Sequence, residues 1–329
     1  MNPADFDTLA GILARWGLRP ARLRPDIDIA GSPERSLSRA ALEDAERRLF
    51  ILESLDPAAI DRKREIARTI AALHLRLPEA RPYLILPDGD FFVRAEGRFW
   101  QAAPYVEGFP LRRPDYAGEG WRGSLLADLL VRLRAAASLT PETAGSPVFS
   151  AAAFVRDLEH KIRGREAALH ARILPAFAHL EMSFFPSEAE LPAAFAHGDF
   201  HPLNMIWSAD GIRALVDWEF CGRKPESYDA ALLVGCLGME HPQYLVGDLV
   251  LELVARLRRN AGYTERSWDS FFDLVLALRF AWLSDWLRRG DAEMIDLEAT
   301  YIGLLHENRA VFRRSWGLPE ASLPQTFSR

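Results

Sequence analysis

The pattern of apolar positions divides the chain into a first part with short segments and a second part with long ones. Phe6, Leu9, Leu13 and Trp16 share one face of a short helix that ends at Gly17. Short apolar segments between turn residues then predict strands near 22–29, 36–42, 48–53, 83–86, 91–95 and 99–103. The first hundred residues are therefore predicted to form mostly sheet.

One helix interrupts this sheet pattern. Asp56 can cap its N-terminus and Pro57 suits its first turn. Ile60, Ile70 and other apolar residues then recur at helical spacing, so the helix is expected to run to about residue 74 or 77. Farther along, Asp88–Gly89 predicts a hairpin turn between the segments 83–86 and 91–95.

Beyond Pro104 the apolar period becomes helical. The predicted helices cover about 121–139, 151–180, 247–260, 265–289 and 292–315. The exception is a short hairpin near the middle of this part. The sequence thus predicts an α+β protein with two lobes: an N-terminal lobe over 1–103, made of an antiparallel sheet with one helix, and a mainly helical C-terminal lobe over 104–329.

Composition narrows the class of partner. With 40 Lys and Arg against 46 Asp and Glu, the net charge is −6, which disfavours nucleic acid and anionic membranes as partners. The two cysteines, Cys221 and Cys236, are too few for a disulfide framework and lack metal-ligand spacing, so a reducing compartment is expected. Since we find no apolar stretch of membrane-helix length and no signal-peptide pattern, a cytoplasmic protein is expected.

The segment 197–219 carries the candidate chemistry. Asp199 is followed five residues later by Asn204, and Asp217 comes after the predicted hairpin over 205–216. Phosphoryl transfer needs such a set: a carboxylate that accepts the proton of the acceptor hydroxyl, and hard oxygen ligands for Mg²⁺. In this interpretation Asp199 is the base, while Asn204 and Asp217 bind the metal.

These residues resemble the aminoglycoside phosphotransferase and choline kinase superfamily, whose members are built like protein kinases. The resemblance rests on three segments: 197–204 with 217–219, the hinge-like segment 100–108, and Tyr228-Asp229-Ala230. It implies a bilobal protein-kinase-like fold, with ATP and Mg²⁺ as cofactors and ATP bound between the lobes. Lobe order and the helix after the third strand agree with it, so it covers most of the chain.

The resemblance also implies roles for further residues. Adenine would meet the backbone near Ala102, Ala103 and Tyr105. The turn that includes Gly31, Ser32 and Ser36 would cover the phosphates, although Gly31-Ser32-Pro33-Glu34 is not a glycine-rich phosphate loop and by itself is more typical of a surface turn. Three residues would support the catalytic loop, namely His197, His201 and Asp229.

One residue departs from the pattern of the superfamily. The third strand ends in Glu53, where the superfamily usually has the lysine that meets the phosphates. Two explanations stay open. Either the charge pair is reversed, with Glu53 facing Arg64 or Arg68 on the next helix and Arg35 or Arg39 contacting phosphate, or nucleotide binding is weakened or lost.

The resulting hypothesis is an ATP- and Mg²⁺-dependent phosphotransferase that acts on a hydroxyl of a small molecule, such as an amino alcohol, a sugar or an aminoglycoside-like compound. The alternatives are a catalytically silent kinase-like protein that binds a nucleotide or metabolite, and a protein Ser/Thr kinase of the same superfamily.

Trp282 and Trp286 lie four residues apart on a predicted helix. They could form a cage for a quaternary ammonium group, but a core position is the more typical interpretation.

Overall fold

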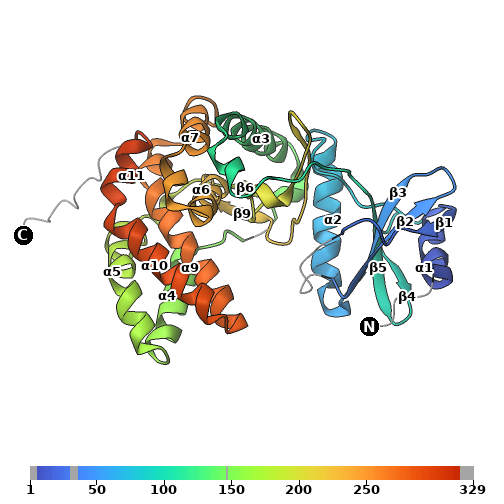
Figure 1. The fold of residues 1–329 in the computed structure, drawn as a ribbon, viewed down its shortest axis with the longest axis horizontal. Helices are drawn as coiled ribbons and strands as arrows, with labels where there is room; N and C mark the ends of the chain where they lie inside the picture. The colour runs from blue at the N-terminus through green and yellow to red at the C-terminus, as the bar shows by residue number, and fades with distance from the viewer. Residues whose placement is uncertain (1–5, 30–35, 146, 319–329) are drawn as a thin grey trace, which may run out of the picture. The chain divides into compact units, whose positions relative to one another are not determined.

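Two compact units make up the chain in the computed structural model, which describes residues 6–29, 36–145 and 147–318 (Figure 1). The N-terminal unit comprises Met1–Phe109 together with Met205–Glu219, and the C-terminal unit comprises Pro110–Asn204 together with Phe220–Arg329. The chain therefore leaves the N-terminal unit at residue 109, returns to it at residue 205 and leaves it again at residue 219.

The N-terminal unit is built on a curled antiparallel sheet with strand order β1-β2-β3-β5-β4. The strands are β1 (Pro20–Leu23), β2 (Ser38–Asp44), β3 (Leu49–Leu55), β4 (Val93–Ala95) and β5 (Arg98–Pro104). Helix α1 (Phe6–Leu13) packs against the sheet through a core that includes Leu9, Leu42, Leu52 and Trp100. Because side chains alternate along a strand, Glu53 points away from this core.

Helix α2 (Ile60–His74) follows β3 as predicted. The Asp56 carboxylate accepts a hydrogen bond from the Ala58 amide at 2.9 Å, which caps the short 3-10 turn before the helix. A second core, formed by Leu55 and Ala67 with two phenylalanines, joins α2 to the sheet. The helix is thereby fixed to the strand that carries Glu53.

The hairpin β7 (Met205–Trp207) and β8 (Ile212–Leu215) belongs to the N-terminal unit. Hydrogen bonds attach it at several points: Phe109 N donates to Trp207 O at 2.9 Å, an Arg213 guanidinium donates to Glu107 O at 2.9 Å, and Leu215 N donates to Glu79 O at 2.8 Å. The segment that follows the hairpin, with Asp217, is therefore held by the sheet-containing unit.

The C-terminal unit is mostly helical. Its helices are α3 (Gly120–Ser138), α4 (Ala151–Arg163), α5 (Ala167–Ser183), α6 (Tyr228–Glu240), α7 (Asp248–Asn260), α8 (Glu265–Asp269), α9 (Phe271–Arg289), α10 (Ala292–Glu307) and α11 (Arg309–Ser315). A two-stranded antiparallel sheet pairs β6 (Ala193–Ala196) with β9 (Gly222–Pro225). The helices agree with the predicted α+β class, and the sheet between β6 and β9 was not expected.

Several predicted boundaries were wrong. The segment 151–180 forms two helices because the chain turns at Gly164, where the amides of Arg165 and Glu166 both bond to the carbonyl of Ile162. Similar breaks at Ser270 and Asn308 divide the last two predicted helices. Helix α6 was not predicted, because ten of its thirteen residues are buried and no amphipathic pattern marks it.

The predicted strand over 83–86 is absent from the described sheet. Gly89 does form the expected turn with positive φ, and the Leu86 amide donates to the Asp90 carbonyl at 2.8 Å, but β4 begins only at Val93. Its hairpin partner is β5, and the turn between them lies at Glu96–Gly97. The turn at Gly89 is therefore present as predicted, but it does not connect two strands.

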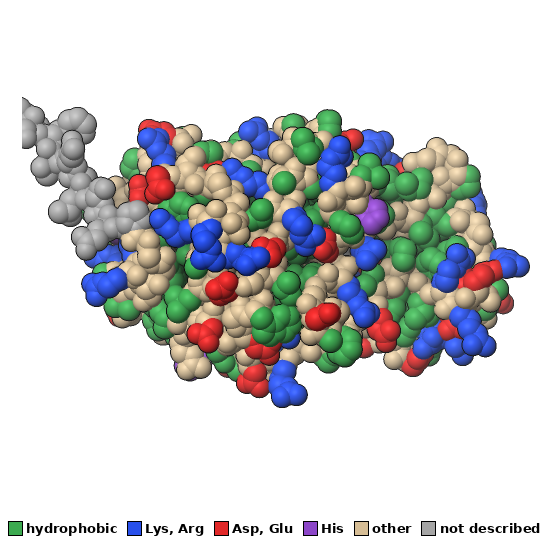
Figure 2. All heavy atoms as spheres, turned by 90° about the horizontal axis from the view of Figure 1, so that it is seen from above, with side chains coloured by type: hydrophobic (Ala, Val, Ile, Leu, Met, Phe, Trp, Pro, Cys, Tyr) green, Lys and Arg blue, Asp and Glu red, His purple; other side chains and the backbone are tan. Residues whose placement is uncertain are grey.

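Charges of both signs are interspersed on the molecular face in Figure 2, which agrees with the small net charge. Among the described residues, no helix is long and apolar enough to cross a membrane.

Candidate active site

The loop between β6 and β7 brings Asp199 and Asn204 together in the C-terminal unit. The Asn204 side-chain amide donates both to the backbone carbonyl and to the carboxylate of Asp199, at 2.9 Å in each case. Both residues are buried. These bonds assign the amide nitrogen to Asp199, so the Asn204 carbonyl oxygen Oδ1 is directed away from it and is available as an oxygen ligand.

Asp229, in the first turn of α6, anchors the start of this loop. Its carboxylate accepts hydrogen bonds from the backbone amides of His197 at 2.7 Å and Gly198 at 2.8 Å. Burial raises the pKa of Asp229 to about 6, although these two bonds and the charge of Lys224 favour the ionised form. The loop backbone is therefore tied to a carboxylate that is costly to bury.

The two predicted loop histidines take different positions. His197 is fully buried, and its ring nitrogen Nδ1 accepts a hydrogen bond from the Asp199 amide at 3.3 Å. His201 lies beside the catalytic candidate, with Nε2 at 3.5 Å from an Asp199 carboxylate oxygen. Both thus contact Asp199 from within its own loop.

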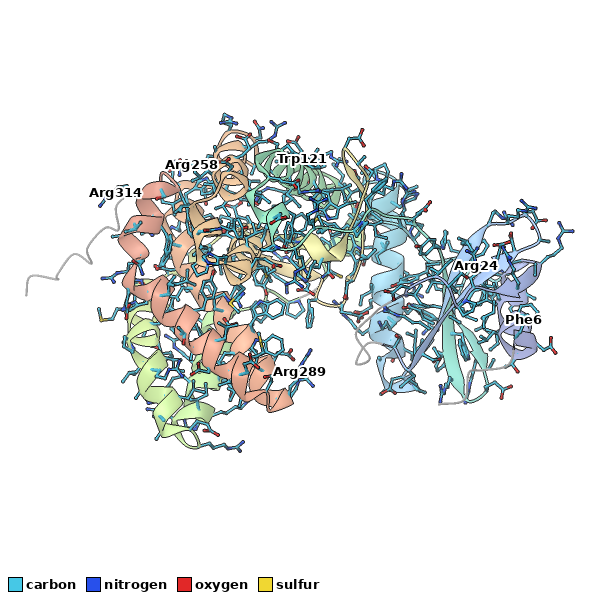
Figure 3. All side chains as sticks on the ribbon, viewed as in Figure 1. Phe6, Arg24, Trp121, Arg258, Arg289 and Arg314 are labelled. Atoms are coloured by element: carbon cyan, nitrogen blue, oxygen red, sulfur yellow. The ribbon has the colours of Figure 1, made fainter. Side chains whose placement is uncertain are left out.

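Trp282 and Trp286 on α9 are half-buried, so the prediction that they are core residues was wrong. Their rings lie 6.4 Å apart, and Trp282 also packs edge-on against His201 at 6.3 Å. Arg289, labelled near the end of α9 in Figure 3, places its guanidinium 5.2 Å from the centre of the Trp286 ring. Arg289 of this chain therefore contacts one of the two tryptophans that the sequence suggested as a cage for a cationic ligand.

Asp217 lies in the N-terminal unit, two residues after the end of β8, and has a left-handed backbone with φ of +69°. Of the three described non-glycine residues with positive φ, the other two, Arg47 and Glu96, are in tight turns between antiparallel strands. A left-handed aspartate outside such a turn is unfavourable unless its surroundings impose it. Strain of this kind is common at functional sites, which singles out Asp217.

Glu53 is paired within the sheet. Arg39, its neighbour on β2, forms an ion pair with its carboxylate, and the Gln101 amide on β5 donates to it at 2.6 Å. Arg64 instead binds Asp90 at 2.9 Å, and no described contact joins Arg68 to Glu53. The predicted pairing of Glu53 with the following helix was therefore wrong, because the strand register places Arg39 directly beside it.

The sequence-based expectations overlooked the side chain of Lys63. It is buried on α2 and forms an ion pair with Glu219, two residues after Asp217. A signal was present, because Lys63 occupies the same face as Ile66, Ala67 and Ile70 and so falls on the apolar stripe of the helix. A lysine on such a stripe needs a partner when buried.

The predicted adenine contacts lie at the end of β5. The Tyr105 amide donates to Leu49 O at 2.8 Å, and the Ala102 carbonyl accepts from the Leu84 amide at 2.7 Å, so both groups already have backbone partners. Ala103 is paired with Ile51. Gly31 and Ser32 lie outside the described residues, whereas Ser36 lies just before β2.

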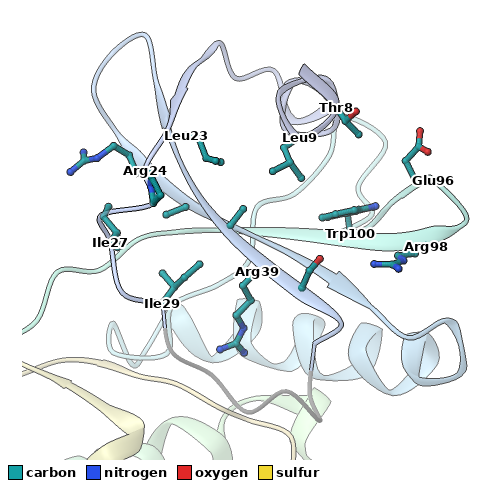
Figure 4. A pocket seen from close by; sticks show the side chains of 14 residues that line it. Thr8, Leu9, Leu23, Arg24, Ile27, Ile29, Arg39, Glu96, Arg98 and Trp100 are labelled. Carbon is teal, nitrogen blue, oxygen red and sulfur yellow. The ribbon is translucent and has the colours of Figure 1, made fainter. Parts of the chain in front are cut away.

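A hollow of about 640 Å³ opens between α1 and the first strands of the sheet (Figure 4). Leu9, Trp100 and several aliphatic side chains line it, together with Arg24 and Arg39. Ala102, Ala103 and Tyr105 are not part of its lining. The hollow is therefore distinct from the predicted adenine contacts.

The chemistry of the candidate ligands suits Mg²⁺. Among the described residues, no three His, Cys, Asp or Glu side chains gather into a metal-binding group. Mg²⁺ needs no such group, because it commonly takes one or two protein oxygens and completes its shell with water and phosphate. The Asn204 carbonyl oxygen and the Asp217 carboxylate are donors of this kind.

The fold and the loop define a protein of the kinase-like phosphotransferase class. The family model described as the phosphotransferase enzyme family matches residues 36–271, which is most of the chain and includes Asp199, Asn204 and Asp217. The chain therefore belongs to the phosphotransferase enzyme family. No curated protein matches the sequence.

Solved structures with low sequence identity share the fold. An aminoglycoside phosphotransferase from Alicyclobacillus acidocaldarius is 14% identical with a TM-score of 0.64, and the match covers 96% of each chain. A microcompartment-associated aminopropanol kinase is 16% identical with a TM-score of 0.66, covering 96% of this chain and 99% of its own. An amicoumacin kinase in complex with AMP-PNP, Ca²⁺ and its ligand is 12% identical with a TM-score of 0.66, covering 92% and 94%.

Proposed function

We propose that this protein transfers the γ-phosphoryl group of ATP, with Mg²⁺, to a hydroxyl group of a small molecule. The observation that carries the proposal is the buried pairing of Asp199 with Asn204 in a loop anchored by Asp229. Family membership supports the reaction type. Structural neighbours named as an aminopropanol kinase and as macrolide and spectinomycin phosphotransferases support a small hydroxylated acceptor.

Asp199 would orient the acceptor hydroxyl and accept its proton. The hydroxyl oxygen forms a bond to the γ-phosphorus as the bond from that phosphorus to the bridging oxygen breaks, and ADP leaves. Asn204 holds the Asp199 carboxylate in one rotamer through its amide, which reduces the reorganisation needed at the moment of transfer. The rate advantage in such a site comes mainly from positioning and from charge stabilisation.

Asn204 and Asp217 would bind Mg²⁺ through Oδ1 and a carboxylate oxygen. A bound Mg²⁺ supplies positive charge that neutralises the phosphate oxygens. Adenine would lie along the end of β5 at Ala102, Ala103 and Tyr105, with Ser36 near the phosphates. His197, His201 and Asp229 would keep the loop in shape.

A second candidate function is a kinase-like protein that binds a ligand without turnover. The observation in its favour is Glu53, an acidic residue on the third strand that is held by Arg39 and Gln101. The ion pair with Glu53 engages Arg39, the arginine that could otherwise meet nucleotide phosphates. This candidate predicts weak or absent Mg-ATP binding and no ATP consumption with any acceptor.

The proposal is tested by ATP consumption in a screen of amino alcohols, sugars and aminoglycosides, followed by detection of the phosphorylated product. Asp199→Asn should lower kcat by about 10²-fold or more with little change in nucleotide affinity, since general-base catalysis typically contributes a factor of 10² to 10⁴. Asp210→Asn, in the exposed turn of the β7–β8 hairpin, is the matched control and should retain activity. An Asp199→Asn enzyme as active as the wild type would refute the assignment of the base.

A further inference from the structure

Lys63 and Glu219 form an ion pair inside the N-terminal unit that joins α2 to the segment after β8. The Lys63 side chain is 8% exposed and that of Glu219 is 23% exposed. Arg62, the preceding residue on α2, also reaches the backbone carbonyl of Glu219, at 3.4 Å. Two consecutive residues of one helix therefore hold the same residue of the loop.

Burying this pair is costly, so it calls for an explanation. A lysine taken out of water loses its hydration, and an ion pair rarely repays the loss in stability. An apolar residue at position 63 would continue the stripe of Ile66, Ala67 and Ile70 at no such cost. What the ion pair provides, and an apolar residue at position 63 would not, is a bond that holds the Glu219 side chain to the helix in one arrangement.

The loop fixed in this way contains the strained residue Asp217. On its C-terminal side, Glu219 is held by α2; Trp218, between them, is buried, and its indole nitrogen donates to Leu215 O at 2.9 Å. On its N-terminal side, the amide of Leu215 donates to Glu79 O, just beyond the end of α2. A left-handed aspartate persists only where its neighbours are held firmly on both sides.

We propose that Lys63 is a positioning residue for Asp217, acting through Glu219 to hold the candidate metal ligand in its left-handed conformation. This inference rests on the proposed function, because positioning Asp217 matters only if Asp217 binds Mg²⁺. Lys63 itself makes no contact with the nucleotide in this account. Loss of the Lys63 side chain weakens Mg²⁺ binding at Asp217 and leaves nucleotide binding without metal unchanged.

Arg64 provides a matched comparison on the same helix. It lies one residue after Lys63 and forms an ion pair with Asp90 at 2.9 Å, in a loop that contains no candidate metal ligand. Removing the Lys63–Glu219 pair or the Arg64–Asp90 pair removes one positive charge and one ion pair between α2 and a loop. The control therefore separates a general loss of stability from a specific effect on Asp217.

The experiment uses the full chain as Lys63→Met, Glu219→Gln, Arg64→Met and the charge exchange Lys63→Glu with Glu219→Lys. The first measurement is amide hydrogen exchange over residues 212–220 without metal or nucleotide. The second is calorimetric binding of AMP-PNP over a range of Mg²⁺ concentrations, with a metal-free series in EDTA. If Lys63→Met fails to fold, Glu219→Gln removes the same pair from its more exposed side.

Lys63→Met and Glu219→Gln should each accelerate exchange over 212–220 and raise the Mg²⁺ concentration for half-maximal binding by about ten-fold, which is the lower end of the loss typical when the residues that orient a metal ligand are removed. The charge exchange should recover part of the effect, and Arg64→Met should show neither change. An equal loss of AMP-PNP affinity with and without Mg²⁺ would overturn the proposal, since it would place Lys63 on the nucleotide.

Unchanged exchange over 212–220 in Lys63→Met would also overturn the proposal. If the wild type shows no Mg²⁺-dependent binding, the proposed function fails as a separate result. The exchange data still decide in that case whether the Lys63–Glu219 pair holds the Asp217 segment.

Discussion

Gly198 occupies a backbone conformation and a space that leave no room for a side chain. Its φ is +85°, and a Cβ atom built on it would lie 2.1 Å from the carbonyl oxygen of Phe220. The close approach brings the loop that begins with His197 against the chain that leads into β9. A glycine is thus required next to Asp199 for a steric reason, independent of any catalytic role.

Gly198→Ala should destabilise the protein by about 2 kcal/mol or more, because the backbone strain of a left-handed alanine adds to a clash with main-chain atoms that cannot move aside. Gly262→Ala is the control: it has a similar positive φ of +63° but nothing within 4 Å of its Cβ, so it should cost about 1 kcal/mol. Urea unfolding of both variants measures the difference. Equal costs would show that the contact with Phe220 O relaxes.

At the scale of elements, α6 and the catalytic loop are linked by the Asp229 carboxylate. Burial raises its pKa from 3.8 to about 6, so the folded protein binds a proton more tightly than the unfolded chain does. A raised folded-state pKa stabilises the protein below the unfolded value, and that contribution is lost as the pH rises through about 6. A rise of about two pKa units corresponds to about 3 kcal/mol.

The wild type should therefore lose stability relative to Asp229→Asn as the pH rises from about 4 to about 7, by on the order of 3 kcal/mol. The relevant quantity is the difference between the two free energies of unfolding, since other carboxylates such as Glu226 have lowered pKa values and act in the opposite direction. Asp210→Asn should show no comparable trend. A difference that is constant over this range would mean that Asp229 keeps an ordinary pKa.

A buried ion pair connects α9 to α10. The Arg279 guanidinium donates two bonds of 2.7 Å to the Glu298 carboxylate, and both side chains are nearly inaccessible to water. Glu298→Gln should destabilise the protein by about 3 to 5 kcal/mol, because it leaves the guanidinium charge buried without a counter-ion.

Glu181→Gln is the control for this pair. Glu181 binds Arg156 between α4 and α5, where both side chains are about half exposed, so its loss should cost no more than about 1 kcal/mol. Thermal and urea unfolding of the two variants test the contrast. A similar small cost for Glu298→Gln would indicate that water reaches Arg279.

At the scale of the whole molecule, the N-terminal unit is completed by a segment that lies a hundred residues away in the chain. The segment 205–219 contributes Trp207, Leu215 and Trp218, all of which are buried. It also contains Asp217, whereas Asp199 and Asn204 belong to the C-terminal unit. The candidate residues for the chemistry are thus distributed over two separately packed units.

A fragment of residues 1–109 should consequently be less stable than the same fragment joined through a flexible linker to 205–219. The shorter fragment exposes the surface covered by Trp207, Leu215, Trp218 and the other buried side chains of the segment, and burying one large apolar side chain contributes about 1.5 to 3 kcal/mol. Urea unfolding followed by circular dichroism compares the two. Equal stability of the two fragments would mean that the segment 205–219 contributes nothing to the free energy of unfolding of the N-terminal unit.

Much of the fold followed from local pattern. The short helix at the start, β2, β3 and α2 were predicted because their apolar spacing and the Asp56–Pro57 cap are properties of neighbouring residues. Helix α6 was not found, because a helix buried on all sides has no polar face to set its period. The helix breaks at Gly164 and Asn308 were also missed, since an apolar pattern continues across them.

The sequence by itself determined the pairing of chemistry within one loop, because Asp199 and Asn204 are only five residues apart and their contact needs only local backbone geometry. The sequence could not identify the ion-pair partner of Glu53 or the ion-pair partner of Lys63. Arg39 meets Glu53 through strand register, and Lys63 meets Glu219 across 156 residues of chain. Only the tertiary structure decides such pairs, because buried charges must find counter-charges wherever packing places them.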